Sequence, residues 1–165
     1  MMALAQIEPA VQGRLPILVG GNGAGLLGHA AAHADIIGLQ GLGRTLADGH
    51  RHTVRWTANR VDEQLDQVRD GAGQRFDALE LNALVQVVEI TDDAEASTRR
   101  LLERVDGLAP ADVEAIPYVL IGTVEEIAAK IERCRSRWGI SYFVVRALDE
   151  FAPVIETVRA AEQLQ

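Results

Sequence analysis

The residues best suited to chemistry form a glycine-rich turn near the start of the chain. Residues 16–39 are PILVGGNGAGLLGHAAAHADIIGL, in which a short apolar run leads into the turn and an alanine-rich segment follows. Backbone N–H groups in such a turn and the dipole of the following helix both point toward a bound anion. The candidate phosphate-binding residues are Gly20, Gly21, Asn22, Gly23 and Ala24. The alternative is that the glycines only allow a tight turn.

The same stretch contains a G-x-G-x-x-G pattern over residues 23–28. In a dinucleotide-binding fold the first glycine closes the strand, and an acidic residue about 20 positions later binds the ribose. Here the strand is expected to end at Gly20-Gly21, before the pattern begins, so that Gly28 would lie inside a helix. The next strand ends in Leu39-Gln40, without an acid. The pattern therefore does not indicate a dinucleotide site.

Two arginines are weaker candidates for the same anion site. Arg44 lies in residues 40–57, a long glycine-containing segment expected to be a loop, which is enriched in positive charge. Arg146 follows the last expected strand. In a parallel α/β protein both positions lie at the same end of the sheet as the glycine turn. The alternatives are a solvated loop for Arg44 and an ion pair with Asp149 or Glu150 for Arg146.

Other reactive side chains do not form a recognisable set. His29 and His33 are one helical turn apart, but no cysteine or carboxylate cluster completes a metal site with them and His50 or His52, so we expect no metal. Cys134 is the one cysteine, which excludes a disulfide within the chain and makes a reducing cytoplasm the expected location. No activating context surrounds Cys134, so we expect it to be inert.

The elements that must position these residues follow from hydrophobic periodicity. Strands are predicted over 17–20, 36–39, 79–90 and 140–145, and helices over 24–34, 58–71, 91–107, 123–138 and 150–163. Residues 108–122 are expected to connect two helices through a short helical turn. Four apolar strands, each followed by a helix, imply parallel pairing and right-handed crossovers. The prediction is one α/β domain over residues 1–165.

The composition and net charge exclude some classes of protein. The chain has 165 residues, 48% of them hydrophobic and 24% charged, and a net charge of −8. A polyanion needs a basic surface, so no nucleic-acid partner is expected. No apolar run approaches the length of about 18 residues that a membrane helix needs, and the first residues do not resemble a signal peptide. We expect a cytoplasmic protein with no membrane association.

Two segments resemble the luciferase-like monooxygenases, most closely the branch that depends on the deazaflavin coenzyme F-420. The first is residues 15–39, with its strand, glycine turn and "AA..AD". The second is residues 118–145, YVLIGTVEEIAAKIERCRSRWGISYFVV, with "GT.EE(I/V)A" before a strand. The resemblance covers nearly all of residues 14–161.

The resemblance implies a parallel (β/α) barrel that binds FMN or coenzyme F-420 at the C-terminal ends of its strands, with the glycine turn on the cofactor phosphate. A complete barrel needs about 250 residues. This chain matches only the last four strands, a partial TIM barrel of about four βα units. The groups that hold the flavin ring come from the missing half, so no catalytic residue is assigned. Neither the substrate nor the choice between the two cofactors follows from the sequence.

Three hypotheses of function follow. The first is an oxidoreductase that carries out flavin- or deazaflavin-dependent hydride transfer or monooxygenation, whether or not the isolated half barrel is active. The second is a non-catalytic structural or partner-binding remnant, and the third a sugar-phosphate-binding module. A half barrel has open strand edges. We therefore expect either a homodimer or a complex with a separate N-terminal half-barrel chain.

Overall fold

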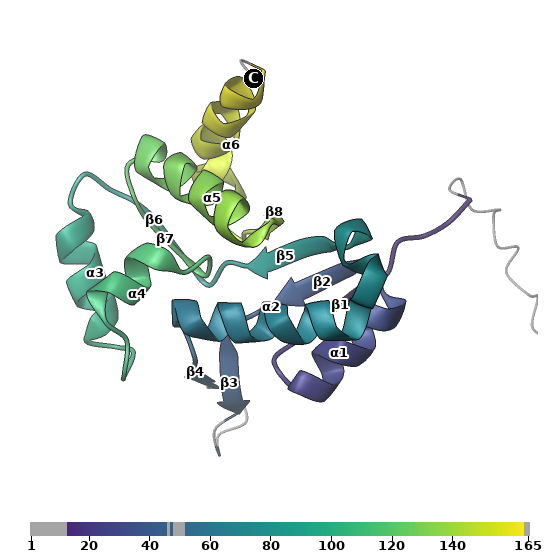
Figure 1. Ribbon diagram of the computed structural model, residues 1–165. Coiled ribbons are helices and arrows are strands. Elements are labelled where there is room, and N and C mark those ends of the chain that lie inside the picture. Colours follow the sequence, from purple (N-terminus) through teal and green to yellow (C-terminus); the bar gives the residue numbers. More distant parts are fainter. Residues whose placement is uncertain (1–12, 46, 48–51, 164–165) are drawn as a thin grey trace, which may run out of the picture.

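The centre of the molecule is a parallel four-stranded sheet (Figure 1). The computed structural model describes residues 13–45, 47 and 52–163. The strands lie in the order β1 (Leu18–Gly21), β2 (Ile36–Leu39), β5 (Glu80–Leu84) and β8 (Ile140–Val144), and every neighbouring pair is parallel. The predicted α/β class with parallel strands is confirmed. The barrel is not closed, because β1 and β8 lie at opposite edges of the sheet.

Helices cover one face of this sheet. α1 (Ala24–His33) and α2 (Ala58–Ala72) pack side by side, and a short 3-10 helix, η1 (Gly73–Ala78), follows α2 (Figure 1). The strand residues facing them are fully or almost fully buried and belong to one hydrophobic cluster with Leu27, Val61 and Leu65. These strand residues are Ile37, Leu39, Leu81, Ala83 and Ile140. Their burial follows from the apolar runs in the sequence, since a strand covered by helices is continuously hydrophobic.

The opposite face, called the inner face below, has a different composition. Gly20, Gly38, Asn82 and Tyr142 form one row across the four strands. A Cβ added to Gly38 would lie 3.5 Å from Cδ2 of Leu18 and 3.4 Å from Oδ1 of Asn82, so these side chains share the inner face. Leu18 is 45% exposed and Tyr142 39% exposed. The described part of the chain therefore leaves the two edges of this face exposed, whereas Gly38 and Asn82 in its centre are buried.

Two further helices, α5 (Val124–Trp138) and α6 (Leu148–Glu162), flank strand β8 in the sequence. α5 precedes β8, and α6 follows it and packs on α5. The predicted capping box of α5 is confirmed: the amide of Glu126 donates to Thr123 Oγ1 at 3.2 Å, and the amide of Thr123 donates to Glu126 Oε2 at 2.9 Å. Gly139, in the left-handed conformation with φ of 73°, ends α5.

The prediction of one strand over residues 79–90 is wrong. The chain leaves the main sheet after Leu84 and continues as β6 (Val87–Ile90), which pairs in parallel with β7 (Val119–Gly122) in a separate two-stranded sheet. Val85 N–H still donates to the Val144 carbonyl, whereas Gln86 N–H donates to the Tyr118 carbonyl. The change of partner occurs at Val85-Gln86, inside a stretch whose pattern is that of one continuous strand, so periodicity did not reveal it.

Two segments predicted to be irregular contain strands. Within residues 40–57, β3 (Leu42–Thr45) and β4 (His52–Val54) form an antiparallel hairpin, so not every strand pair is parallel. Residues 108–122 contain the expected helical turn, α4 (Pro110–Ala115), but then form β7. The helix predicted over 91–107 is shorter, α3 (Ala94–Leu102), and Asp93 caps it by accepting from the amide of Ala96 at 3.0 Å. No helix within the described ranges is long and apolar enough to cross a membrane.

Candidate functional site

The glycine turn lies where β1 ends and α1 begins, at the C-terminal edge of the parallel sheet. Gly21 is the last residue of β1, Gly23 is the N-cap of α1, and Ala24 is its first helical residue. Gly23 has no side chain with which to satisfy the first amides of the helix. A helix N-terminus presents unpaired N–H groups and a partial positive charge, which together favour an anion.

The first two glycines of the turn lie close to side chains of the chain itself. A Cβ on Gly20 would lie 2.9 Å from Nε2 of Gln40, and one on Gly21 would overlap the side chain of Leu26. Gly38 is similarly confined, since its Cβ would lie 3.1 Å from Cα of Gly20. The atoms nearest to a Cβ at Gly20 and Gly21 are the ends of movable side chains, so packing favours glycine at these two positions without requiring it.

Gly23 and Gly25 have no such explanation. No described atom lies within 4 Å of a Cβ added at either position. Neither residue has a positive φ, unlike Gly41, Gly73, Gly107, Gly122 and Gly139. In the part of the chain that the structure describes, neither packing nor backbone conformation demands glycine here. Glycine also permits close approach of a ligand to the backbone.

Asn22 is engaged inside the protein. Its side-chain amide donates to the carbonyl of Leu42, and its Oδ1 accepts from Nε2 of Gln64 at 3.2 Å. Gln64 Oε1 in turn accepts from the hydroxyl of Tyr118 at 3.3 Å. Both Gln64 and Tyr118 are fully buried, and burial raises the pKa of Tyr118 well above its ordinary value. The Asn22 side chain therefore holds the turn in place, and its contribution to a ligand site would come from its backbone.

Arg60 is a site residue that the sequence analysis missed. Its guanidinium donates to the carbonyl of Asn22 at 2.7 Å and to Glu63 at 2.8 Å, and its side chain is only 11% exposed. Arg60 lies in the first turn of α2, whose cap Thr57 accepts from the Arg60 amide at 3.2 Å. A positive charge thus lies against the turn. No sequence signal links residues 22 and 60, because only tertiary packing brings them together.

The two candidate arginines do not converge on the turn within one chain. Arg44 lies in β3, but its side chain falls outside the described residues. Arg146 is exposed and lies two residues beyond the end of β8. Its strand is separated from β1 by β2 and β5, a distance of about 14 Å for three strand spacings. Arg146 therefore lies at the expected end of the sheet but at the opposite edge.

The other candidate reactive groups are structural in character. The rings of His29 and His33 lie 4.6 Å apart on the exposed face of α1. Among the described residues, no three histidine, cysteine or carboxylate side chains could hold a metal ion together; His50 lies outside them, as does the His52 side chain. Cys134 is buried, and burial raises the pKa of its thiol. A protonated, buried thiol is a poor nucleophile.

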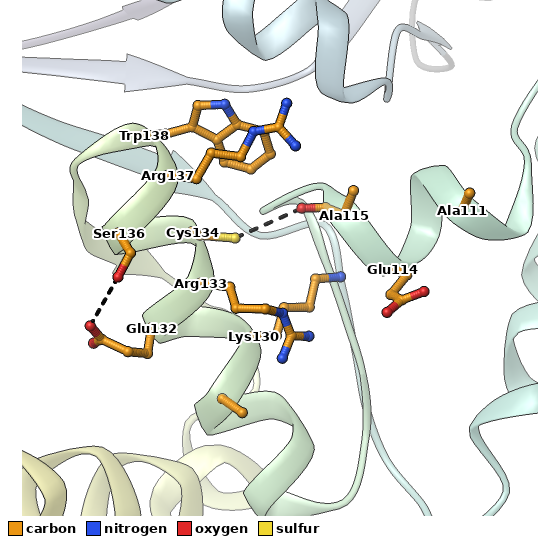
Figure 2. Close-up of a pocket in the computed structure, with 11 residues that line it drawn as sticks. Ala111, Glu114, Ala115, Lys130, Glu132, Arg133, Cys134, Ser136, Arg137 and Trp138 are labelled. Atoms are coloured by element: carbon orange, nitrogen blue, oxygen red, sulfur yellow. Dashed lines mark hydrogen bonds between the residues drawn. The ribbon is translucent and has the colours of Figure 1, made fainter.

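A cavity of about 780 Å³ lies away from the turn, between α4 and α5 (Figure 2). Lys130 and Arg133 line both this cavity and a neighbouring one of about 670 Å³. Lys130 is buried and donates to the carbonyls of Val113 and Val119, at 2.6 and 2.5 Å. Burial lowers the pKa of Lys130 to about 8. These bonds tie α4 and the start of β7 to α5, so we assign Lys130 a structural role.

Comparison with known proteins supports the fold. No protein-family model matches the sequence, and no curated protein matches it significantly. The coenzyme F420-dependent tetrahydromethanopterin reductase of Methanopyrus kandleri superposes with a TM-score of 0.53 at 14% identity, over 81% of this chain and 45% of that one. The long-chain alkane monooxygenase LadA superposes with a TM-score of 0.54 at 12% identity, over 93% of this chain and 41% of that one.

These structures confirm the predicted resemblance at the level of the fold. Both are luciferase-like TIM-barrel proteins, and both are oxidoreductases. This chain spans less than half the length of either. The described strands therefore correspond in fold to part of the barrel of these two structures.

Proposed function

We propose that this chain is the cofactor-phosphate-binding half of a luciferase-like oxidoreductase. The cofactor would be coenzyme F-420 or FMN, and the reaction class hydride transfer or monooxygenation. Once bound, such a cofactor supplies the redox chemistry, while the protein provides binding and orientation. The names of the two structural neighbours, an F420-dependent reductase and a monooxygenase, support this class.

The observation that carries the proposal is the open space above Gly23 and Gly25. Both residues lie at the N-terminus of α1, neither needs to be glycine for internal reasons, and both face a region where a Cβ would meet nothing in the described chain. A phosphate placed there could approach the backbone amides closely. In TIM-barrel enzymes this edge of the sheet carries the active site.

The donors available at the turn fit a phosphate group. The amides around Gly23 supply neutral hydrogen-bond donors, and the guanidinium of Arg60 adds positive charge from behind the Asn22 carbonyl. The buried chain of hydrogen bonds from Asn22 through Gln64 to Tyr118 fixes the backbone of the turn. A preorganised turn loses less conformational entropy when it binds a ligand. The residues of this chain would thus bind and orient the cofactor through its phosphate.

The exposed side chains at the edges of the inner face favour a second candidate function, that of a non-catalytic structural half barrel. Leu18 and Tyr142 are substantially exposed there, as expected for a unit that packs on a partner. Such a remnant would keep its fold and its partner surface without binding a cofactor. Cofactor binding therefore separates the two hypotheses.

The test is titration of the purified chain with FMN and with coenzyme F-420, following cofactor fluorescence and thermal unfolding. A site loaded at 100 times its Kd should stabilise the fold by about 2.7 kcal/mol. Gly23→Asp should abolish binding because it places a carboxylate where the phosphate would lie. Aspartate is a preferred N-cap, so the same variant should retain or raise the stability of the free protein.

The matched control is Gly13→Asp, since Gly13 also has open space around it but lies outside the turn. We expect this variant to bind like the original chain, although it adds the same charge. Absence of a stability shift with either cofactor, for the chain alone and with a separately supplied N-terminal half barrel, would overturn the oxidoreductase proposal. It would favour the structural one.

A further inference from the structure

We propose that two copies of this chain close one eight-stranded barrel around a two-fold axis, with the inner faces of both copies inside. Strand β8 of each copy would pair in parallel with β1 of the other. The pairing does not depend on which cofactor binds, and its surface is formed by the strand edges and not by the glycine turn itself.

The first argument is the state of the sheet edges. In the described chain β1 and β8 each have one neighbouring strand, so each presents a row of unpaired backbone groups on its outer side. Such edges invite pairing with another chain. All four strands are parallel, and a two-fold axis along the barrel brings β8 of one copy beside β1 of the other at two equivalent places. The unpaired backbone groups on the outer sides of β1 and β8 would then both find hydrogen-bond partners.

The second argument is the distribution of exposed apolar side chains. Three of them, Leu15, Ile17 and Leu18, lie in or just before β1 and are 75%, 56% and 45% exposed. At the other edge, Tyr142 of β8 is 39% exposed. The two edges that would meet are therefore both apolar. Inside a closed barrel Leu18 and Tyr142, which lie on the inner face, would join a packed interior, as the inward-facing residues of TIM barrels do.

The third argument is the number of strands. A TIM barrel closes with eight strands, and the sheet described here has four. The two neighbouring structures are more than twice as long as the parts that this chain matches, so the matched unit is less than half of each. A second copy supplies the four strands that closure requires.

Closure would also change the surroundings of the glycine turn. Within one chain Arg146 lies three strand spacings from the turn, whereas closure places Arg146 of the second copy on the strand next to β1. Because the strands are parallel, this arginine would extend from the same end of the barrel as the turn. The glycine turn of one copy and Arg146 of the other would then form one phosphate site. This consequence rests on the proposed function.

The test of closure is the mass of the purified chain in solution, measured by light scattering after size exclusion over a range of concentrations. We expect twice the chain mass of 17.9 kDa. Leu18→Lys and Tyr142→Lys, at opposite edges, should each give the single-chain mass. Circular dichroism should show that both variants stay folded, since both side chains are already partly exposed. Ile90→Lys is the matched control, because Ile90 is 38% exposed but lies in β6, outside the inner face.

Three results would overturn the proposal: a single-chain mass for the original protein, open-ended larger assemblies, or edge variants that keep the double mass. A chain that stays single and forms a complex only with a separate N-terminal half barrel would assign the surface to that partner instead. For the shared site, Arg146→Ala should weaken cofactor binding about tenfold while the mass stays doubled. If Arg146→Ala leaves the affinity for the cofactor unchanged while the mass stays doubled, the shared phosphate site is rejected but closure of the barrel is not.

Discussion

Gly71 of α2 lies directly against the backbone of Gly28 in α1. A Cβ added to Gly71 would lie 2.6 Å from Cα of Gly28 and would overlap its carbonyl oxygen. The last glycine of the G-x-G-x-x-G pattern therefore allows two helices to pack closely, which agrees with its predicted place inside a helix. The contact is asymmetric, because a Cβ added to Gly28 would meet only the carbonyl oxygen of Gln67, at 3.9 Å.

This asymmetry predicts opposite effects for two similar substitutions. Gly71→Ala should lower the free energy of unfolding by about 1–3 kcal/mol, because the added methyl group forces the helices apart. Gly28→Ala should raise it by up to about 1 kcal/mol, since alanine is the better helix former and the space is adequate. Urea unfolding of both variants checks the prediction. Equal effects of the same sign would show that the two helices are not packed in this way.

Gly25→Ala should separate stability from binding. Gly25 is in the first turn of α1, and its Cβ would meet no described atom, so alanine there should stabilise the free protein by about 0.5–1 kcal/mol. If the phosphate site is as proposed, the methyl group would obstruct the approach of the ligand and weaken binding. Thermal unfolding with and without cofactor measures both effects. Unchanged affinity in a stabilised variant would exclude a close contact at Gly25.

Substitutions in the buried hydrogen-bond chain should not be additive. Gln64→Met removes the partner of both Asn22 and Tyr118, and we expect a loss of about 1–3 kcal/mol. Tyr118→Phe removes one bond and should cost less. In the double variant the Tyr118 hydroxyl is no longer left unpaired, so the combined loss should be smaller than the sum of the two. A double-mutant cycle by chemical unfolding measures the difference, and strict additivity would contradict the bond between them.

The buried ammonium of Lys130 predicts a pH dependence of stability. Burial lowers its pKa from 10.5 to about 8, so between these values the unfolded chain binds more protons than the folded one. The free energy of unfolding should therefore rise with pH across this window, relative to a Lys130→Met variant, and the difference between the two should level off below pH 8.

Both proteins in that comparison should carry Cys134→Ser. Burial raises the pKa of the Cys134 thiol and the charge of Lys130 lowers it, so replacing Lys130 would change the titration of Cys134 and its contribution would not cancel in the difference. The raised pKa of Tyr118 contributes equally to both proteins and cancels in the difference. If the free energies of unfolding of the two proteins change in parallel between pH 8 and 10.5, the pKa of Lys130 is not lowered by burial.

Local patterns in the sequence were sufficient to predict much of the framework. The four strands of the main sheet, the capping box at Thr123 and the glycine turn between β1 and α1 all depend on residues close together in the chain. Hydrophobic periodicity and capping act over one or two turns of helix or a few strand residues, so they can be recognised without knowing the fold. The turn could therefore be identified as a candidate anion site from its letters alone.

Only the tertiary structure showed how each residue of the turn is packed and which distant residues surround it. It showed that side chains lie close to Gly20 and Gly21 while open space surrounds Gly23 and Gly25, and it brought Arg60 against a turn 38 positions earlier in the chain. It also showed that the chain passes from the main sheet to a second one at Val85-Gln86, within a stretch predicted to be one strand. Each of these outcomes depends on contacts between segments far apart in sequence. Such contacts form only when the chain as a whole buries its apolar surface, so no local pattern encodes them.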